Sequence, residues 1–347
     1  MPDTPLRPAH EALGARFTDF GGWSMPLQYQ GVIAEHMAVR ESVGVFDVTH
    51  LGRFRLTGVG ATAAIRSELC NDIDKIKPGR AQYTMALNDE GGVVDDIIIW
   101  RFDENDYWVM PNGVNFDELL ARFTAAPGVD AVPVRSDTVL LAVQGPDSAE
   151  VLDQAIGIVP GRFRVATGEF ADGPMWVAGT GYTGERGAEV AVPNSNGARL
   201  LAVLMDAGAV PAGLGSRDTL RLEMGYPLWG QDLDEETSPL EAGLGWVVDW
   251  DHDFVGREAL LRQRENGLQK ALVSFRTADR RPPRHGYALR SGSSAGVVAS
   301  GNFSPVLEVG IGLGFMSPPI ATDAALEMDV RGTWQPVQRV ETPFLDR

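Results

Sequence analysis

The sequence predicts a mixed α+β protein whose chain ends in an all-β domain. Helical and strand-like patterns are interspersed over residues 1–248, and a charged connection at residues 249–253 follows them. From Ala271 onward the pattern consists of short strands separated by Gly, Pro and Ser, which is typical of a small β-domain. A chain of 347 residues is too long for one ordinary core, so two or three domains are expected.

The first fifty residues are expected to form two short helices around a Gly/Pro-rich turn. The first helix covers residues 8–13 and stops at Gly14. The second covers residues 31–42, where apolar side chains can share one face, and Gly44 suits a position just past its C-terminus.

The middle of the chain is expected to mix strands with helices. A polar, Gly-rich hairpin turn at residues 88–92 joins two of the strands, and Pro146 suits the first turn of a helix. The expected strands are residues 54–56, 82–87, 93–100, 107–110, 139–143, 175–178 and 189–192. The expected helices are residues 61–69, 115–123, 197–205, 217–224 and 256–265, with an irregular stretch at 225–240.

The charge balance and the cysteine and histidine content exclude several classes of function. The net charge of −17 argues against a nucleic-acid partner, because an acidic surface repels phosphate backbones. Cys70 is the only cysteine, so one chain can form neither a disulfide nor a cysteine-based metal centre. No metal site is expected, because no paired spacing occurs among the histidines, which are His10, His36, His50, His252 and His285.

The sequence contains no signal for export or membrane insertion. The N-terminus lacks a basic-then-apolar pattern, and no apolar stretch approaches the ~20 residues of a membrane span. We therefore expect a cytoplasmic protein without a membrane partner.

Two glycine-rich segments resemble catalytic motifs but are expected to be structural. Residues 310–314 lack the correct final glycine of a dinucleotide loop, and Pro318 follows where a helix should begin, so a buried strand of small residues is expected. Residues 292–296 match a hydrolase nucleophile elbow, but they lack its flanking strand and helix, so an exposed hairpin turn is expected.

Two adjacent carboxylates interrupt an otherwise apolar strand at residues 93–100. Because successive side chains of a strand point to opposite faces, Asp95 and Asp96 are expected on different faces of the sheet. If both faces are covered, at least one carboxylate lies in an apolar setting, where it should be paired, hydrogen-bonded or have a raised pKa. Such a group suits proton transfer. The alternative, in which both accept hydrogen bonds from nearby turn amides, stays open from sequence alone.

A cation and a glycine-framed turn are candidate parts of a binding site. Arg217 follows Ser216, an expected helix N-cap, and a guanidinium beside free helix amides can receive a carboxylate. A structural ion pair with Asp218 is the alternative. Residues 180–185 form a tight turn that lets Tyr182 approach a ligand, with Glu189 close behind.

Six segments together resemble hallmark segments of the glycine cleavage T-protein family. They occur in family order between residues 6 and 344, with spacing close to that of the family. Thr49 and Leu51 stand where Ser and Met are usual, and Arg53 where Glu or Gln is common. The segments are residues 46–52, 91–96, 180–185 with Gly187 and Glu189, 211–218, 226–232 and 300–305.

The resemblance implies a fold, a reaction and a set of site residues. The fold would be a three-domain cloverleaf around a central folate channel, with residues 1–50 and 137–250 in the first domain, 51–136 in the second, and 251–347 in a β-barrel-like third. The reaction would move the methylene of an aminomethyl group from the lipoyl arm of the partner H-protein to tetrahydrofolate and release ammonia. Asp96 resembles the family's catalytic aspartate. The implied folate-binding residues are Tyr83, Asn112, Tyr182, Glu189, Arg217, Leu51 and Tyr226.

Two other functions are compatible with the resemblance. A tetrahydrofolate-dependent demethylase of the same fold would take a methyl group from a small donor, although Asp96 and the T-protein motifs argue against it. A non-catalytic folate-binding protein of iron–sulfur assembly would carry a cysteine in the segment 226–232, where this chain has none.

Overall fold

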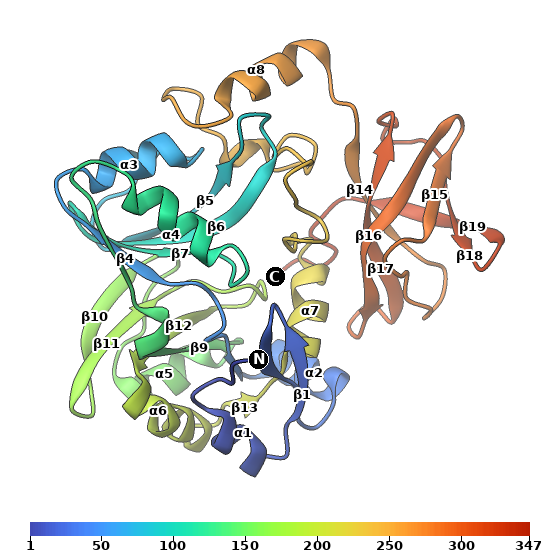
Figure 1. Ribbon diagram of the computed structural model, residues 1–347. Coiled ribbons are helices and arrows are strands. Elements are labelled where there is room, and N and C mark those ends of the chain that lie inside the picture. The colour runs from blue at the N-terminus through green and yellow to red at the C-terminus, as the bar shows by residue number, and fades with distance from the viewer. The chain divides into compact units, whose positions relative to one another are not determined.

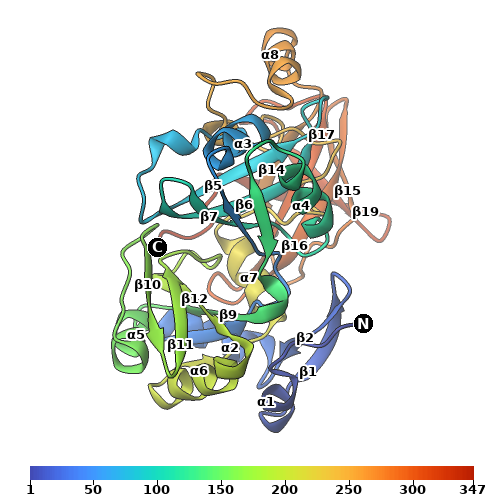
Figure 2. The ribbon, with the colours of Figure 1, turned by 60° about the vertical axis from the view of Figure 1, so that its left-hand side comes forward.

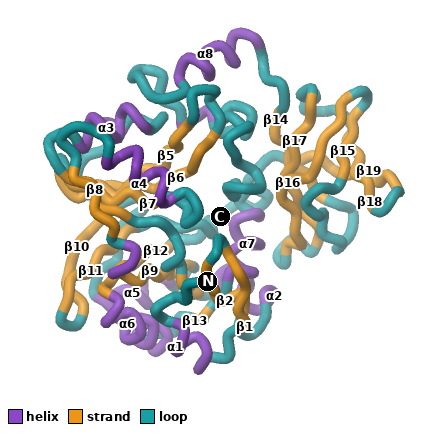
Figure 3. Tube along the Cα trace, viewed as in Figure 1, coloured by secondary structure: helices purple, strands orange, loops and turns teal.

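The computed structural model describes residues 1–347 and confirms the α+β class (Figure 1). Its helices and strands are drawn along the chain in Figure 3. The α-helices are α1 (Arg7–Ala12), α2 (Val32–Glu41), α3 (Ala61–Glu68), α4 (Phe116–Thr124), α5 (Ser148–Ile156), α6 (Asn194–Asp206), α7 (Leu214–Glu223) and α8 (Arg257–Asn266), with short 3-10 helices η1 (Ile73–Lys75), η2 (Arg135–Asp137) and η3 (Gly245–Val247). None of the helices is both long and apolar enough to span a bilayer.

The strands form two open sheets, a closed barrel and a separate hairpin. The hairpin pairs β1 (Arg16–Phe20) with β2 (Trp23–Gln28). One sheet has the order β10 (Val165–Phe170), β11 (Gly173–Ala178), β12 (Gly187–Pro193), β9 (Thr138–Gln144), β3 (Gly44–Asp47), β13 (Val210–Pro211). The other has the order β5 (Arg80–Leu87), β6 (Val93–Asp103), β7 (Asp106–Met110), β4 (Phe54–Thr57), β8 (Asp130–Pro133).

Tertiary contacts group the chain into two compact units. Unit 1 contains Met1–Ile65, Ile73–Tyr83 and Ile97–Asp218, and unit 2 contains Arg66–Asp72, Thr84–Asp96 and Thr219–Arg347. Helices α3 and α7 and strands β5 and β6 contribute residues to both units. The three-domain division and the cloverleaf arrangement that the resemblance implies stay predictions.

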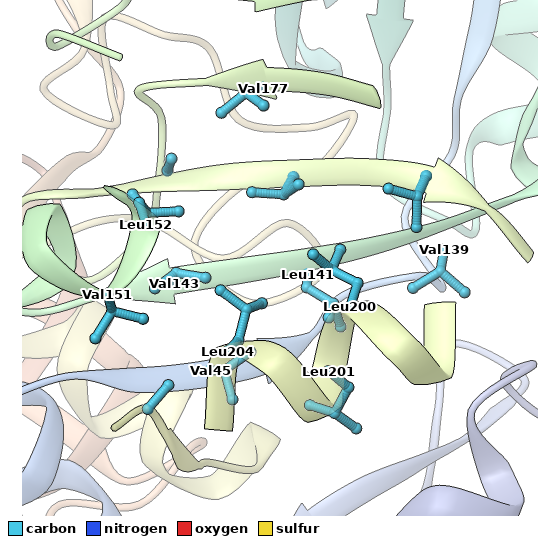
Figure 4. Packing of buried hydrophobic residues seen from close by; sticks show 14 of the residues in the cluster. Val45, Val139, Leu141, Val143, Val151, Leu152, Val177, Leu200, Leu201 and Leu204 are labelled. Carbon is cyan, nitrogen blue, oxygen red and sulfur yellow. The ribbon is translucent and has the colours of Figure 1, made fainter. Parts of the chain in front are cut away.

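The main core of unit 1 lies between the six-stranded sheet and helices α5 and α6 (Figure 2). Every residue of β9 is buried, since this strand has neighbours on both edges and α6 against one face. Figure 4 shows Val139, Leu141 and Val143 of β9 beside Leu200 and Leu204 of α6. This packing holds β12, the neighbour of β9, in a fixed register.

The C-terminal part of unit 2 is the closed β-domain that the sequence predicts. Its strands follow the order β14 (Ala271–Arg276), β17 (Val309–Ser317), β16 (Ser294–Ser304), β15 (Ala288–Ser291), β18 (Leu326–Val330), β19 (Thr333–Val340), and β19 pairs back with β14. The glycine-rich segment 310–314 is a buried part of β17, as expected. A Cβ on Gly312 would lie 2.7 Å from Cζ of Phe275, so the small residue makes room for that ring.

The N-terminal prediction needs correction. Both expected helices form as α1 and α2, but the segment between them is the β1–β2 hairpin, and Gly21 and Gly22 make its turn with positive φ angles. Gly44 lies past the C-terminus of α2, as expected, and begins strand β3. A Cβ there would lie 2.4 Å from Cγ2 of Val39, so packing against α2 requires the glycine.

Candidate folate-binding site

Glu189 is a buried carboxylate in the middle of the six-stranded sheet. On β12 it pairs with Ala178 of β11 on one side and with Ala142 of β9 on the other. The Thr180 hydroxyl donates a hydrogen bond of 2.5 Å to Oε2 of Glu189. Because an ionised carboxylate can accept about four hydrogen bonds, this side chain has capacity for a two-point contact with a ligand.

The turn after β11 is shaped by one buried glutamine. Nε2 of Gln144 donates to the carbonyl of Thr180 at 3.1 Å, and Oε1 accepts from the Thr183 hydroxyl at 2.9 Å. The chain passes so close to Gln144 that a Cβ on Gly181 would lie 2.0 Å from Oε1. Packing therefore requires Gly181, and the positive φ angle of 83° favours glycine at Gly184, in agreement with the tight turn that the sequence predicts.

Arg40 of α2 also forms hydrogen bonds with this turn. Its Nη1 donates to the carbonyl of Thr183 at 2.7 Å and to Oε1 of Glu185 at 2.8 Å. The Arg40 side chain is fully buried, so this ion pair is sheltered from solvent. Sequence patterns assign no role to Arg40 or Gln144, because their partners lie far away along the chain. Together they fix the backbone on both sides of Tyr182.

Arg217 lies over the ring of Tyr182, with its guanidinium carbon 4.8 Å from the ring centroid. Its Nη1 is buried and makes no hydrogen bond. Burial lowers the pKa of Arg217, and the negative charge of Glu189 partly opposes that shift. A buried cationic nitrogen without a hydrogen-bond partner is costly, and an anionic ligand would remove that cost.

The expected capping at this helix is wrong in detail. Helix α7 begins at Leu214, so Ser216 lies inside the first turn, where its hydroxyl donates to the carbonyl of Gly213 at 2.9 Å. The amides of Ser216 and Arg217 also donate to Gly213, and Glu35 accepts from the Gly213 amide at 2.8 Å. The amides of Ser216 and Arg217 are therefore not free, and the guanidinium of Arg217 is the group of this residue that can still accept an anionic partner.

Leu51 and Asn112 are brought together by two loops of unit 1. The Gly52 amide donates to the carbonyl of Pro111 at 2.8 Å, which places the loop after β3 against the loop after β7. Both Leu51 and Asn112 are half-buried. Asn112 is directly followed by Gly113, where a Cβ would lie 2.5 Å from the carbonyl oxygen of His50.

Arg53, one of the departures from the family pattern, anchors the first of these loops. It is fully buried and donates to the carbonyls of Thr49 and Leu51 at 3.2 and 2.9 Å. It also donates to the carbonyl of Thr138 at 2.8 Å. The guanidinium thus supplies several donors at once, and it holds Leu51 in place.

His50 belongs to this region although sequence reasoning gave it no role. Burial, followed by the nearby Arg217 cation, lowers the pKa of His50 to about 3. The ring is therefore neutral at physiological pH, and Nδ1 is buried without a hydrogen-bond partner. The ring packs against Phe20 of the β1–β2 hairpin in a T-shaped arrangement, with the ring centroids 5.2 Å apart.

The remaining predicted residues lie on β5, β6 and the segment after α7. Asp95 is fully buried and Asp96 is half-buried, which agrees with a strand that places them in different surroundings. Tyr83 is half-buried on β5. Tyr226 is also half-buried, and its amide donates to the carbonyl of Arg221 at 3.0 Å. Asp96 and Tyr226 belong to unit 2, whereas the other predicted site residues belong to unit 1.

A buried ion pair in unit 2 links two of the hallmark segments. Nη1 of Arg221 lies 2.8 Å from Oδ2 of Asp232, and the Ser300 hydroxyl donates to the same oxygen at 2.7 Å. Nη2 of Arg221 donates to the Ser300 hydroxyl at 2.9 Å. Hydrogen bonds with Arg221 and between Asp232 and Ser300 therefore connect segments 226–232 and 300–305, which are distant in sequence.

Comparison with known proteins identifies the family of the chain. Residues 6–252 match the family described as the GCVT N-terminal domain, and residues 270–346 match the glycine cleavage T-protein C-terminal barrel domain. The chain belongs to the glycine cleavage T-protein family. It is an enzyme of that family, and the relatives described next are named aminomethyltransferases.

Relatives and a solved structure cover nearly the whole T-protein chain. It is 42% identical to an aminomethyltransferase of Prosthecochloris aestuarii over all of both chains. It is 41% identical to an aminomethyltransferase of Thermosynechococcus vestitus, with 99% of this chain and 95% of the relative covered. The crystal structure of the glycine cleavage system aminomethyltransferase T from Bartonella henselae matches with a TM-score of 0.91 at 31% identity, covering 99% of this chain and 98% of the other.

Proposed function

We propose that this protein transfers the methylene of an aminomethyl group, carried on the lipoyl arm of an H-protein, to tetrahydrofolate and releases ammonia. The observation that carries the proposal is the buried, unpartnered Nη1 of Arg217 beside Tyr182. A folate has a carboxylate tail that suits this guanidinium. Its pterin has an amidine edge that suits a buried carboxylate such as Glu189. The names and lengths of the matched relatives support the same assignment.

Each proposed site residue has a separate task. Glu189 accepts hydrogen bonds from the pterin edge, and Arg217 pairs with the carboxylate of the glutamate tail. The aromatic ring of Tyr182, fixed by the turn around Gln144, packs against the folate. The other residues proposed to contact the folate are Tyr83, Asn112, Leu51 and Tyr226.

Asp96 is proposed as the catalytic carboxylate. In the net reaction the bonds from the methylene carbon to the lipoyl sulfur and to the amino nitrogen break, and two bonds form to N5 and N10 of tetrahydrofolate. These nitrogens release two protons, of which one reaches the sulfur and one the leaving ammonia. A carboxylate on β6 suits the task of orienting the reacting amine and carrying a proton.

The decisive experiment is reconstitution with a lipoylated H-protein that carries the aminomethyl group. Tetrahydrofolate is added, and 5,10-methylenetetrahydrofolate and ammonia are measured. We expect equal amounts of both, and neither with H-protein that lacks the lipoyl group. Methyl transfer from a small methylated donor, without any reaction of the loaded H-protein, would instead show a demethylase.

A further inference from the structure

A second cluster of polar side chains lies in unit 2, apart from the proposed folate-binding residues. Asp72, Asp249 and His252 each offer one ligand atom, and these atoms lie within 4.8 Å of one another. Asp72 follows α3, and the other two residues lie on the connection before α8. The side chains of Asp249 and His252 are each 2% exposed, and that of Asp72 is 14% exposed. The cluster is thus built into the protein interior with one side open to approach.

Backbone hydrogen bonds hold the two stretches that carry the cluster. The Asp249 amide donates to the carbonyl of Cys70 at 2.8 Å, and the Val255 amide donates to the carbonyl of Ser67 at 3.0 Å. One bond lies on each side of His252. These bonds therefore fix the backbone of the connection that carries Asp249 and His252 beside the backbone of the segment that leads to Asp72.

The hydrogen bonding of His252 determines which nitrogen faces the carboxylates. Nε2 lies 3.1 Å from the carbonyl oxygen of Leu69, and since a carbonyl can only accept, Nε2 carries the hydrogen. Nδ1 is buried and makes no hydrogen bond, and Oδ1 of Asp249 is 4.0 Å away from it. An imidazole whose second nitrogen donates to a carbonyl is the usual arrangement of a metal-ligating histidine.

We propose that Asp72, Asp249 and His252 bind one divalent late transition-metal ion of the Zn²⁺ class. Imidazole nitrogen combined with carboxylate oxygen suits zinc and its neighbours, whereas Ca²⁺ and Mg²⁺ prefer oxygen ligands. Ligand atoms about 2.1 Å from a tetrahedral zinc lie about 3.4 Å apart, so modest side-chain rotations close the site. Three protein ligands leave the fourth position to water.

Arg66 is the charged neighbour that the ion has to accommodate. Its Nε lies 3.3 Å from Oδ1 of Asp72. Arg66 is partly exposed, so it can move away from the carboxylate as the metal enters. The sequence did not indicate this site, because it has no pair of closely spaced histidines. The third proposed ligand, Asp72, lies far from Asp249 and His252 along the chain.

Metal titration of the full-length protein tests the proposal. The protein is freed of metal with a chelator and titrated with Zn²⁺ by calorimetry, and with Co²⁺ while its visible absorption is recorded. We expect one equivalent of either metal per chain, a cobalt spectrum of four-coordinate geometry, and a rise in Tm with zinc, because only the folded state has the assembled site. Absence of stoichiometric binding in the unmodified protein would overturn the proposal without any variant.

Matched variants assign the ligands. His252→Gln and Asp72→Asn should each weaken zinc binding at least about tenfold, the result of removing one ligand. Asp251→Asn on the same connection and His285→Gln in the barrel serve as controls, and both should bind zinc as the wild type does. If His252→Gln does not fold, Asp72→Asn still decides, since its side chain is the more exposed one. Equal zinc affinity in the ligand variants and the controls would refute this site.

Discussion

The guanidinium carbon of Arg217 lies 4.8 Å from the centroid of the Tyr182 ring. Arg217 is in the first turn of α7, and Tyr182 is in the turn after β11. This contact keeps a cation in place although Nη1 makes no hydrogen bond. A cation over an aromatic face is stabilised by roughly 0.5–2 kcal/mol, which offsets part of the cost of its burial. Tyr182 thus holds Arg217 where the proposed contact with the folate tail requires it.

Arg217→Ala should weaken tetrahydrofolate binding by about tenfold to a hundredfold, since a hydrogen bond to a charged group contributes roughly 1.5–3 kcal/mol. Folate binding measured by calorimetry checks this. The exposed Arg186, on the same turn as Tyr182, is the matched control, and Arg186→Ala should bind folate normally. Unchanged affinity in Arg217→Ala would exclude it as the partner of the folate tail.

Asp96→Asn should retain folate affinity but reduce turnover by about 10²–10⁴-fold, the range for a positioned acid–base group. The comparison requires both folate binding and methylenetetrahydrofolate formation with loaded H-protein. Asp89→Asn, in the exposed hairpin turn between β5 and β6, should leave both unchanged. Near-normal turnover in Asp96→Asn would show that the reaction does not use this carboxylate.

Gly187→Ala should reduce the free energy of unfolding by about 1–3 kcal/mol, the usual cost of overpacking. A Cβ there would lie 2.1 Å from the carbonyl oxygen of Val143 and 2.6 Å from Nε2 of Gln144. Gly161→Ala is the control, because its Cβ would meet only the Arg164 side chain, at 3.4 Å. Denaturant unfolding measures the difference, and equal stability of the two variants would contradict this packing argument.

The buried His50 should make the protein less stable as the pH falls. Its pKa is lowered to about 3 in the folded state, against about 6.5 in the unfolded chain. Between these values only the unfolded state binds the proton, so His50 costs about 1.4 kcal/mol of stability for each pH unit. The free energy of unfolding is measured for the wild type and for His50→Gln between pH 6 and pH 4. For each unit that the pH falls, the wild type should lose about 1.4 kcal/mol relative to the variant.

Removing Arg217 tests the second cause of this shift. Because its positive charge lowers the pKa of His50 after burial, Arg217→Gln should raise that pKa toward its ordinary value. Titration of the ring by NMR measures it directly. Parallel stability curves for wild type and His50→Gln in the acid range would contradict the assignment of a neutral, buried ring.

Local sequence patterns were sufficient for most elements of the fold. Helix α6 and the strands β9 and β12 follow from periodicity within short windows. The sequence did not predict the β1–β2 hairpin, because residues 16–28 lack a clear alternation of apolar and polar residues. Two adjacent glycines, such as those of its turn, also occur in loops that do not join strands. The sequence pattern also misplaced the start of α7, where Ser216 looks like a cap but lies within the helix.

What the sequence by itself determined is the α+β class, the order of most elements, the closing β-domain and the family of the chain. Only the tertiary structure decided that Arg217 lies over Tyr182, that Arg53 holds the loop of Leu51, and that Asp72 lies near His252. Helix and strand preferences act between neighbours along the chain, so a short window records them. Contacts between residues far apart depend on how the whole chain packs, and no local pattern contains that information.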